Sequence, residues 1–205
     1  MKSSTFFWVV SSGLMASCVY VKPSNQGQPL PQTPTYPNNP PVISPPSPIS
    51  VPQTPSLPSN TGSRLSSEEV KTLLTLHNQV RANVGVGNLN WSSDAANYVQ
   101  NWVDQLAATN CSLVHNPNKR YGENLFMGTV GYYGVGDAVK SWESEKSLYN
   151  GETISGSNFS RFGHYTQMVW RNTTQVGCAK ATCGNTLIVG CNYNPAGNFL
   201  GQKPY

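Results

Sequence analysis

The sequence predicts a mixed α+β domain in which helices are interleaved with a small antiparallel sheet. Apolar residues recur at helical spacing in several segments, and two later segments alternate as β-strands around a Gly184-Asn185 turn. Composition sets this domain apart from the rest of the chain. Thirteen of the 16 prolines lie between Pro23 and Pro58, and all nine acidic residues follow Ser63. The domain is therefore assigned to residues 64–205, which is enough chain for one sizeable core.

Four helices and three strands are expected from the spacing of apolar residues. The first helix is the best marked, because Ser66 and Glu69 form a capping box ahead of it. Its apolar positions recur every three or four residues and include His77, and the Gly-Val-Gly run at 85–87 ends it. The other helices are expected at about residues 93–110, 137–149 and 164–171, and the strands at 124–127, 176–181 and 187–193.

The hairpin also selects among the possible disulfides. The four cysteines of the domain can pair in three ways. Because a two-residue turn places Cys183 opposite Thr186, Cys178 falls opposite Cys191, within the distance that a disulfide spans. The expected bridges are therefore Cys178–Cys191 and Cys111–Cys183. Disulfides of this kind favour an oxidising compartment.

Residues 1–18 are typical of an export signal. Lys2 precedes an apolar stretch at 6–15 that is too short to span a bilayer, and small residues then lead to Cys18. Residues 14–18 (LMASC) also resemble a bacterial lipoprotein cleavage site, although Met15 stands where Leu is usual. In that case a lipid on Cys18 would tether the protein to a membrane; otherwise ordinary cleavage leaves it secreted. We expect a secreted, extracellular protein or a cell-envelope lipoprotein.

The composition of residues 19–63 predicts a proline-rich, disordered linker. The segment is rich in Pro, Ser, Thr, Asn and Gln, and it has too little apolar surface to offset the entropy lost on ordering. In the domain that follows, positive and negative side chains nearly balance, without a basic run or a basic helical face. The sequence therefore argues against nucleic acid as a partner. We expect a monomer.

Two long motifs resemble the signatures of the CAP superfamily of cysteine-rich secretory, antigen-5 and pathogenesis-related proteins. The first is GHYTQMVWRNT at residues 163–173, and the second is IVGCNYNPAGNF at residues 188–199. The motif YGENL at 121–125 is similar too, and the ending GQKPY at 201–205 resembles the plant pathogenesis-related branch. The resemblance covers about residues 66–205. It implies a three-layer α-β-α sandwich with a central antiparallel sheet.

The resemblance also implies a cleft lined by two histidines and two glutamates, which by motif are His115, Glu123, Glu145 and His164. Helical spacing puts Glu145 on the apolar face of its helix, where a carboxylate needs a partner. His115 and His164 as neutral imidazoles could hold Zn²⁺ in a weak, open site. The alternatives are a purely structural tetrad and a His/Glu catalytic pair. His77 has no second ligand at helical spacing and is interpreted as packed or partly exposed.

Binding is the kind of function that the resemblance implies. We expect a protein that binds a small lipid, a sterol or a fatty acid, with a defence-like extracellular role and a divalent-metal site. A metal- or His/Glu-assisted hydrolase is the first alternative, although the chain has neither a Gly-x-Ser-x-Gly nor a His-Glu-x-x-His motif. A cell-surface interaction protein with a structural tetrad is the second. A lipid would occupy an apolar groove away from the tetrad, whereas an enzyme would place a nucleophile beside it.

Overall fold

The structure is a computed structural model, and it describes residues 59–205. The predicted signal peptide, Cys18 and linker residues 19–58 lie outside the described residues. Within the described part, helices and strands follow one another in the order α1–β1–α2–β2–α3–η1–η2–α4–β3–β4. This mixture agrees with the α+β class that the sequence predicts.

One four-stranded sheet lies at the centre of the domain. It consists of β1 (Asn90–Trp91), β2 (Gly122–Thr129), β3 (Gln175–Cys183) and β4 (Thr186–Asn194), in the order β1-β3-β4-β2. β3 and β4 form the expected hairpin, and β2 runs antiparallel to β4. β1 is parallel to β3, and sequence reasoning missed it because two residues are too few to show an alternation.

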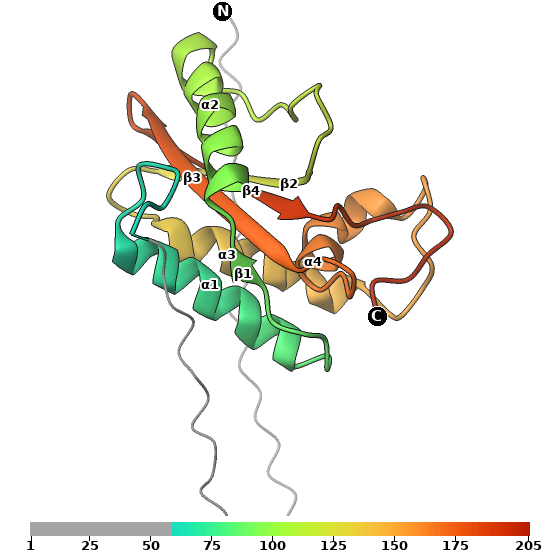
Figure 1. The fold of residues 1–205 in the computed structure, drawn as a ribbon. Helices are drawn as coiled ribbons and strands as arrows, with labels where there is room; N and C mark the ends of the chain where they lie inside the picture. The colour runs from blue at the N-terminus through green and yellow to red at the C-terminus, as the bar shows by residue number, and fades with distance from the viewer. Residues whose placement is uncertain (1–58) are drawn as a thin grey trace, which may run out of the picture. The chain divides into compact units, whose positions relative to one another are not determined.

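Helices cover both faces of this sheet, so the domain has the expected three-layer α-β-α architecture (Figure 1). The helix α2 (Ser93–Thr109) packs on one face, and α1 (Ser67–Ala82), α3 (Val135–Ser144) and α4 (Gly163–Met168) lie on the other. α2 approaches β3 closely at Gly177, where a Cβ would lie 2.2 Å from the backbone nitrogen of Ala96. Only glycine permits that approach.

Strand alternation divides the buried apolar side chains into two clusters. On the α2 face, Ile188 packs with Val99 and Val103. On the opposite face, Val189 belongs to the larger cluster, which also contains Trp142. Burial of each large apolar side chain contributes roughly 1.5–3 kcal/mol, so both faces of the sheet must be covered for the domain to be stable.

The helix boundaries show where periodicity predicts well and where it does not. The capping box of α1 is present, since Ser66 Oγ accepts from the N–H of Glu69 and Glu69 Oε2 accepts from the N–H of Ser66. α3 ends at Ser144, five residues before the predicted end. Glu145 begins the 3-10 turn η1 (Glu145–Leu148). The expectation that it belongs to the α-helix is therefore wrong, but its carboxylate has the partner that the sequence analysis called for, His164.

The structure contains the two expected disulfides, Cys178–Cys191 and Cys111–Cys183. The predicted register is confirmed, because Cys178 pairs with Cys191 and Cys183 pairs with Thr186 across the hairpin. The first bridge joins β3 to β4 inside the core. The second ties the segment after α2 to the end of the hairpin, so it links the α2 layer to the sheet.

Residues before the predicted domain boundary at residue 64 already make hydrogen bonds to the domain. Trp91 Nε1 donates to the carbonyl of Thr61 at 2.8 Å, and Ser93 Oγ donates to the carbonyl of Asn60 at 2.7 Å. Residues 60–63, assigned to the linker from composition, are thus held against β1 and the start of α2. Among the helices of residues 59–205, none combines the length and the apolar character needed to cross a membrane.

Candidate functional site: two histidine–carboxylate pairs and a polar pocket

His164 and Glu145 form the first pair, where η1 meets the start of α4. His164 Nδ1 lies 2.6 Å from Glu145 Oε1. Glu145 Oε2 accepts from the backbone N–H groups of His164 at 2.9 Å and Tyr165 at 3.1 Å. The carboxylate therefore satisfies open N–H groups of the first turn of α4 and also orients the imidazole. The ring of Trp142 stacks on His164, with centroids 6.3 Å apart.

His115 and Glu123 form the second pair, between the α2–β2 connection and β2. His115 Nδ1 lies 2.7 Å from Glu123 Oε1, which also accepts from the backbone N–H of Asn116 at 3.1 Å. The His115 side chain is 62 % exposed and that of Glu123 only 9 %. The corresponding values for His164 and Glu145 are 37 % and 21 %. Both pairs use Nδ1 for the carboxylate, which leaves the Nε2 edge of each ring for another partner.

A buried chain of hydrogen bonds positions α4 against the sheet. His77 Nδ1 lies 2.7 Å from the carbonyl of Leu73, so Nδ1 donates and Nε2 accepts from the Tyr193 hydroxyl at 2.8 Å. Asn124 Nδ2 donates both to the Tyr193 oxygen and to the carbonyl of His164. Burial lowers the pKa of His77 from 6.5 to about 4, as expected for a neutral imidazole in a dry core.

A buried arginine holds the segment that follows α4. Arg81 donates to the carbonyls of Gly87, Met168, Trp170 and Thr173, at 2.6 to 2.9 Å. Burial lowers the pKa of Arg81 to about 10, so the guanidinium remains charged at neutral pH. It therefore anchors the end of the first long motif to α1.

The alternation of β2 turns neighbouring side chains to opposite faces of the sheet. Glu123 points to the same face as Leu125, which packs beneath α2. Asn124 points to the opposite face, toward His164. The structure thus arranges the four predicted residues as two pairs. Among residues 59–205, no group of three or more His, Cys, Asp or Glu side chains is arranged to hold a metal ion.

A pocket of about 360 Å³ opens beside the His115–Glu123 pair. His164 and Glu145 do not line it, although Asn198 of the lining donates to the carbonyl of Gly163, the residue before His164, at 2.8 Å. The lining is formed by three aromatic rings, several amides and short loop segments: Tyr98, His115, Asn116, Asn118, Lys119, Tyr121, Gly122, Glu123, Phe159, Gln167, Asn192, Ala196, Gly197 and Asn198.

Sequence reasoning did not single out the amides and aromatic rings of this pocket. Gln167 and Asn192 stand inside the two long motifs, and a polar residue within an apolar run is the signal that could have marked them. Gln167 also explains the glycine of the YGENL motif, since a Cβ on Gly122 would lie 2.1 Å from Gln167 Oε1. Tyr98 and Phe159 come from unrelated segments, so only folding brings them to the pocket.

The model of the cysteine-rich secretory protein (CAP) family matches residues 74–193. The chain belongs to this family. Pathogenesis-related protein 1B of Nicotiana tabacum is 46% identical over 133 residues, which are 64% of this chain and 78% of that protein. Pathogenesis-related protein 1 of Arabidopsis thaliana is 44% identical over 135 residues, 64% of this chain and 80% of that protein. These relatives support the plant pathogenesis-related branch of the CAP family.

Solved CAP structures share the fold. The crystal structure of NaASP2 with Zn²⁺ has a TM-score of 0.63 and 29% identity, over 73% of this chain and 90% of that one. The structure of BmVAL-1 has a TM-score of 0.58 and 26% identity, over 70% of this chain and 84% of that one. The three-layer sandwich of this CAP domain is therefore the family fold, and one similar protein was crystallised with zinc.

Proposed function

We propose that this CAP protein acts outside the cell as a defence-type binding protein, and that His115 and His164 hold a divalent cation such as Zn²⁺. Two disulfides in the described domain fit an oxidising, extracellular compartment. The plant relatives are named for pathogenesis, which supports the defence-type role. The observation that carries the metal proposal is the Nδ1–carboxylate contact in both pairs.

In metal-binding histidines, the ring nitrogen that does not bind the metal usually donates to a carboxylate or a carbonyl. A carboxylate on Nδ1–H fixes the ring and its tautomer, and it leaves the Nε2 lone pair for the cation. In each pair the carboxylate is held in turn by a backbone N–H, from Asn116 for Glu123 and from Tyr165 for Glu145. A bound Zn²⁺ would supply a Lewis acid. The two rings supply only two ligands, so the site would be weak and open to water.

The pocket lining favours binding over nucleophilic hydrolysis. It contains no serine, threonine or cysteine among the described residues, and the four domain cysteines are in disulfides. A hydrolase of the Ser-His, Thr or Cys-His kind needs such a group within hydrogen-bond reach of its base. This supports the assignment of the histidine–carboxylate pairs to ligand or metal binding.

Zinc calorimetry tests this proposal. Zn²⁺ titrated into the full secreted chain at neutral pH should give saturable heat, and His164→Ala or His115→Ala should each reduce affinity at least tenfold. Affinity should fall toward acid pH, because a protonated imidazole cannot bind the metal. His77→Gln removes the third histidine, which holds α1 to the sheet through Tyr193. Once circular dichroism shows this variant folded at neutral pH, it should bind Zn²⁺ as the wild type does. Wild type without heat, or a double histidine variant that binds normally, would favour a purely structural tetrad.

A small lipid is proposed to bind elsewhere, under the β2–α3 loop. Val130, Tyr133, Val135 and Leu187 line a hollow of about 200 Å³ at the hairpin end of the sheet, and the ion pair of Lys180 and Glu69 lies in the same lining. It lies away from Asn192 at the other end of β4, as expected for a lipid site distinct from the tetrad. Its volume is below the usual range for ligand pockets, so a lipid would have to lift the loop.

A fluorescent fatty-acid analogue tests the lipid proposal. Val130→Asp places a charge at the exposed mouth of the hollow and should reduce binding at least tenfold while the thermal midpoint stays the same. His164→Ala should leave lipid binding unchanged. Equal binding by wild type and Val130→Asp would exclude this hollow as the lipid site.

A further inference from the structure

The pocket beside His115 and Glu123 has a floor of unpaired polar groups. Glu123 on β2 and Asn192 on β4 are direct cross-strand neighbours, and both line the pocket. Asn192 is only 2 % exposed. Within residues 59–205, neither its side-chain amide nor Glu123 Oε2 makes a hydrogen bond to another protein group. Neither is sealed from the pocket, since the one fully buried side-chain polar atom without a partner in the described residues is Tyr149 Oη. Both groups are therefore open to a ligand in the pocket.

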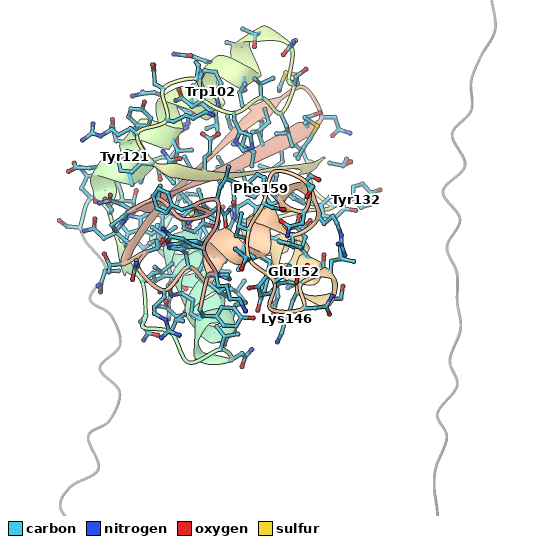
Figure 2. All side chains as sticks on the ribbon, turned by 90° about the vertical axis from the view of Figure 1, so that its right-hand side faces the viewer. Trp102, Tyr121, Tyr132, Lys146, Glu152 and Phe159 are labelled. Atoms are coloured by element: carbon cyan, nitrogen blue, oxygen red, sulfur yellow. A yellow bond between two sulfur atoms is a disulfide. The ribbon has the colours of Figure 1, made fainter. Side chains whose placement is uncertain are left out.

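The same pocket has aromatic walls. Tyr98 of α2 and Tyr121 pack edge to face with ring centroids 5.3 Å apart, and the Arg120 guanidinium lies 5.2 Å from the centre of the Tyr121 ring. Phe159 forms another part of the lining and is half exposed (Tyr121 and Phe159 are labelled in Figure 2). These rings offer flat apolar faces at the rim, while the amide and the carboxylate lie deeper.

This combination excludes two classes of ligand. An apolar lipid in the pocket would cover Asn192 and Glu123 without pairing them, which is unfavourable because they would lose their contact with water. A strongly anionic ligand would meet the Glu123 carboxylate at the floor, and Lys119 is the one cation in the lining. The remaining class must donate to a carboxylate, exchange hydrogen bonds with an amide, and present an apolar face.

A sugar ring meets all three demands. Its hydroxyl groups donate to Glu123 Oε2 and pair with both ends of the Asn192 amide, and its C–H face packs on an aromatic ring. The pocket volume of about 360 Å³ lies in the ordinary range for small ligands. We propose that this pocket binds a neutral, hydroxyl-rich pyranose unit at the end of an oligosaccharide. The proposal deepens the binding role proposed above, and it assigns that role a ligand class different from the lipid.

The test uses three neutral tetrasaccharides as probes: those of β-1,3-glucan, β-1,4-glucan and chitin. Each is titrated into the full secreted chain by calorimetry, and saturable binding of at least one is expected. Asn192→Leu keeps the side-chain shape but removes every hydrogen-bonding atom, and it should weaken that binding at least tenfold. Tyr121→Ala should have a similar effect, and Tyr121→Phe should restore binding because it keeps the ring face.

Tyr132→Ala is the matched aromatic control, since Tyr132 is 85 % exposed and projects from the opposite side of the domain (Figure 2). It should bind the sugar as the wild type does. No binding of any tetrasaccharide at millimolar concentration overturns the proposal, and so does binding that Asn192→Leu and Tyr121→Ala leave unchanged while circular dichroism shows both variants folded. A parallel Zn²⁺ titration separates the two hypotheses, because zinc binding without sugar binding refutes only the sugar site.

Discussion

The domain contains histidines in two contrasting environments: His77 lies in the core, whereas His115 and His164 belong to the histidine–carboxylate pairs. His77 is fully buried between α1 and the sheet, and both of its ring nitrogens have protein partners. His115 and His164 are partly exposed, and each uses Nδ1 for a carboxylate. His77 therefore has a structural role, whereas His115 and His164 each leave Nε2 available for a ligand. Partner number and burial, rather than residue type, separate the two roles.

Acid pH should have the largest effect on stability, and it should act through the buried His77. The folded-state pKa of His77 is about 4 and its ordinary value 6.5, so the unfolded chain binds a proton between these values that the folded chain does not. Stability should therefore fall as pH drops from 6.5 to 4, by about 3 kcal/mol, and His77 should add nothing further below that range. Urea unfolding of the wild type at pH 7, 5.5 and 4 measures the loss.

His77→Gln isolates that effect from the titration of the carboxylates. The variant cannot take up the proton, so its stability should change with pH by about 3 kcal/mol less than that of the wild type. It should also be less stable at pH 7, because Tyr193 and Leu73 lose a well-placed partner. Identical pH dependence in the two proteins would show that His77 does not control acid unfolding.

Glu145→Ala should have the next largest effect. It removes the acceptor for His164 Nδ1 and for two backbone N–H groups of α4, and we expect a loss of about 2 kcal/mol. Glu145→Gln keeps one oxygen acceptor and should cost about 1 kcal/mol. Urea midpoints of both variants measure the difference. An alanine variant as stable as the glutamine variant would mean that solvent replaces the carboxylate fully.

Glu123→Ala should destabilise less, by about 1 kcal/mol. Its carboxylate accepts from one backbone N–H, that of Asn116, and its imidazole partner lies at the surface. Thermal unfolding followed by circular dichroism is sufficient to measure this change. A loss larger than that of Glu145→Ala would reverse the order of the two pairs and place the structural one on β2.

His115→Ala should have the smallest effect on stability, about 0.5 kcal/mol or less, because the side chain is mostly exposed. The same variant should nevertheless weaken Zn²⁺ binding. This dissociation between stability and binding distinguishes a metal ligand from a structural histidine. If His115→Ala unfolded the protein as strongly as Glu145→Ala, the metal assignment would lose its basis.

The sequence predicted most of the fold because its signals are local. The capping box at Ser66, the helical spacing that follows it and the tight turn at Gly184-Asn185 all act over a few residues, and the turn fixed the register of Cys178 with Cys191. Prediction was weakest at helix ends. α3 stops at Ser144 and continues as η1, where the Glu145 carboxylate contacts the start of α4. That contact joins residues far apart in the chain, so no local pattern shows it.

For the site, the sequence by itself determined the candidate residues through the resemblance to the CAP family, with His164 in the first long motif and Glu123 in the YGENL motif. It determined the disulfides through strand register. Only the tertiary structure decided how those residues combine. The structure joins His115 to Glu123 and His164 to Glu145, so the four predicted residues form two pairs. Folding also brings Tyr98, Phe159 and Asn192 to one pocket, which no local pattern encodes because their contact depends on the packing of separate elements.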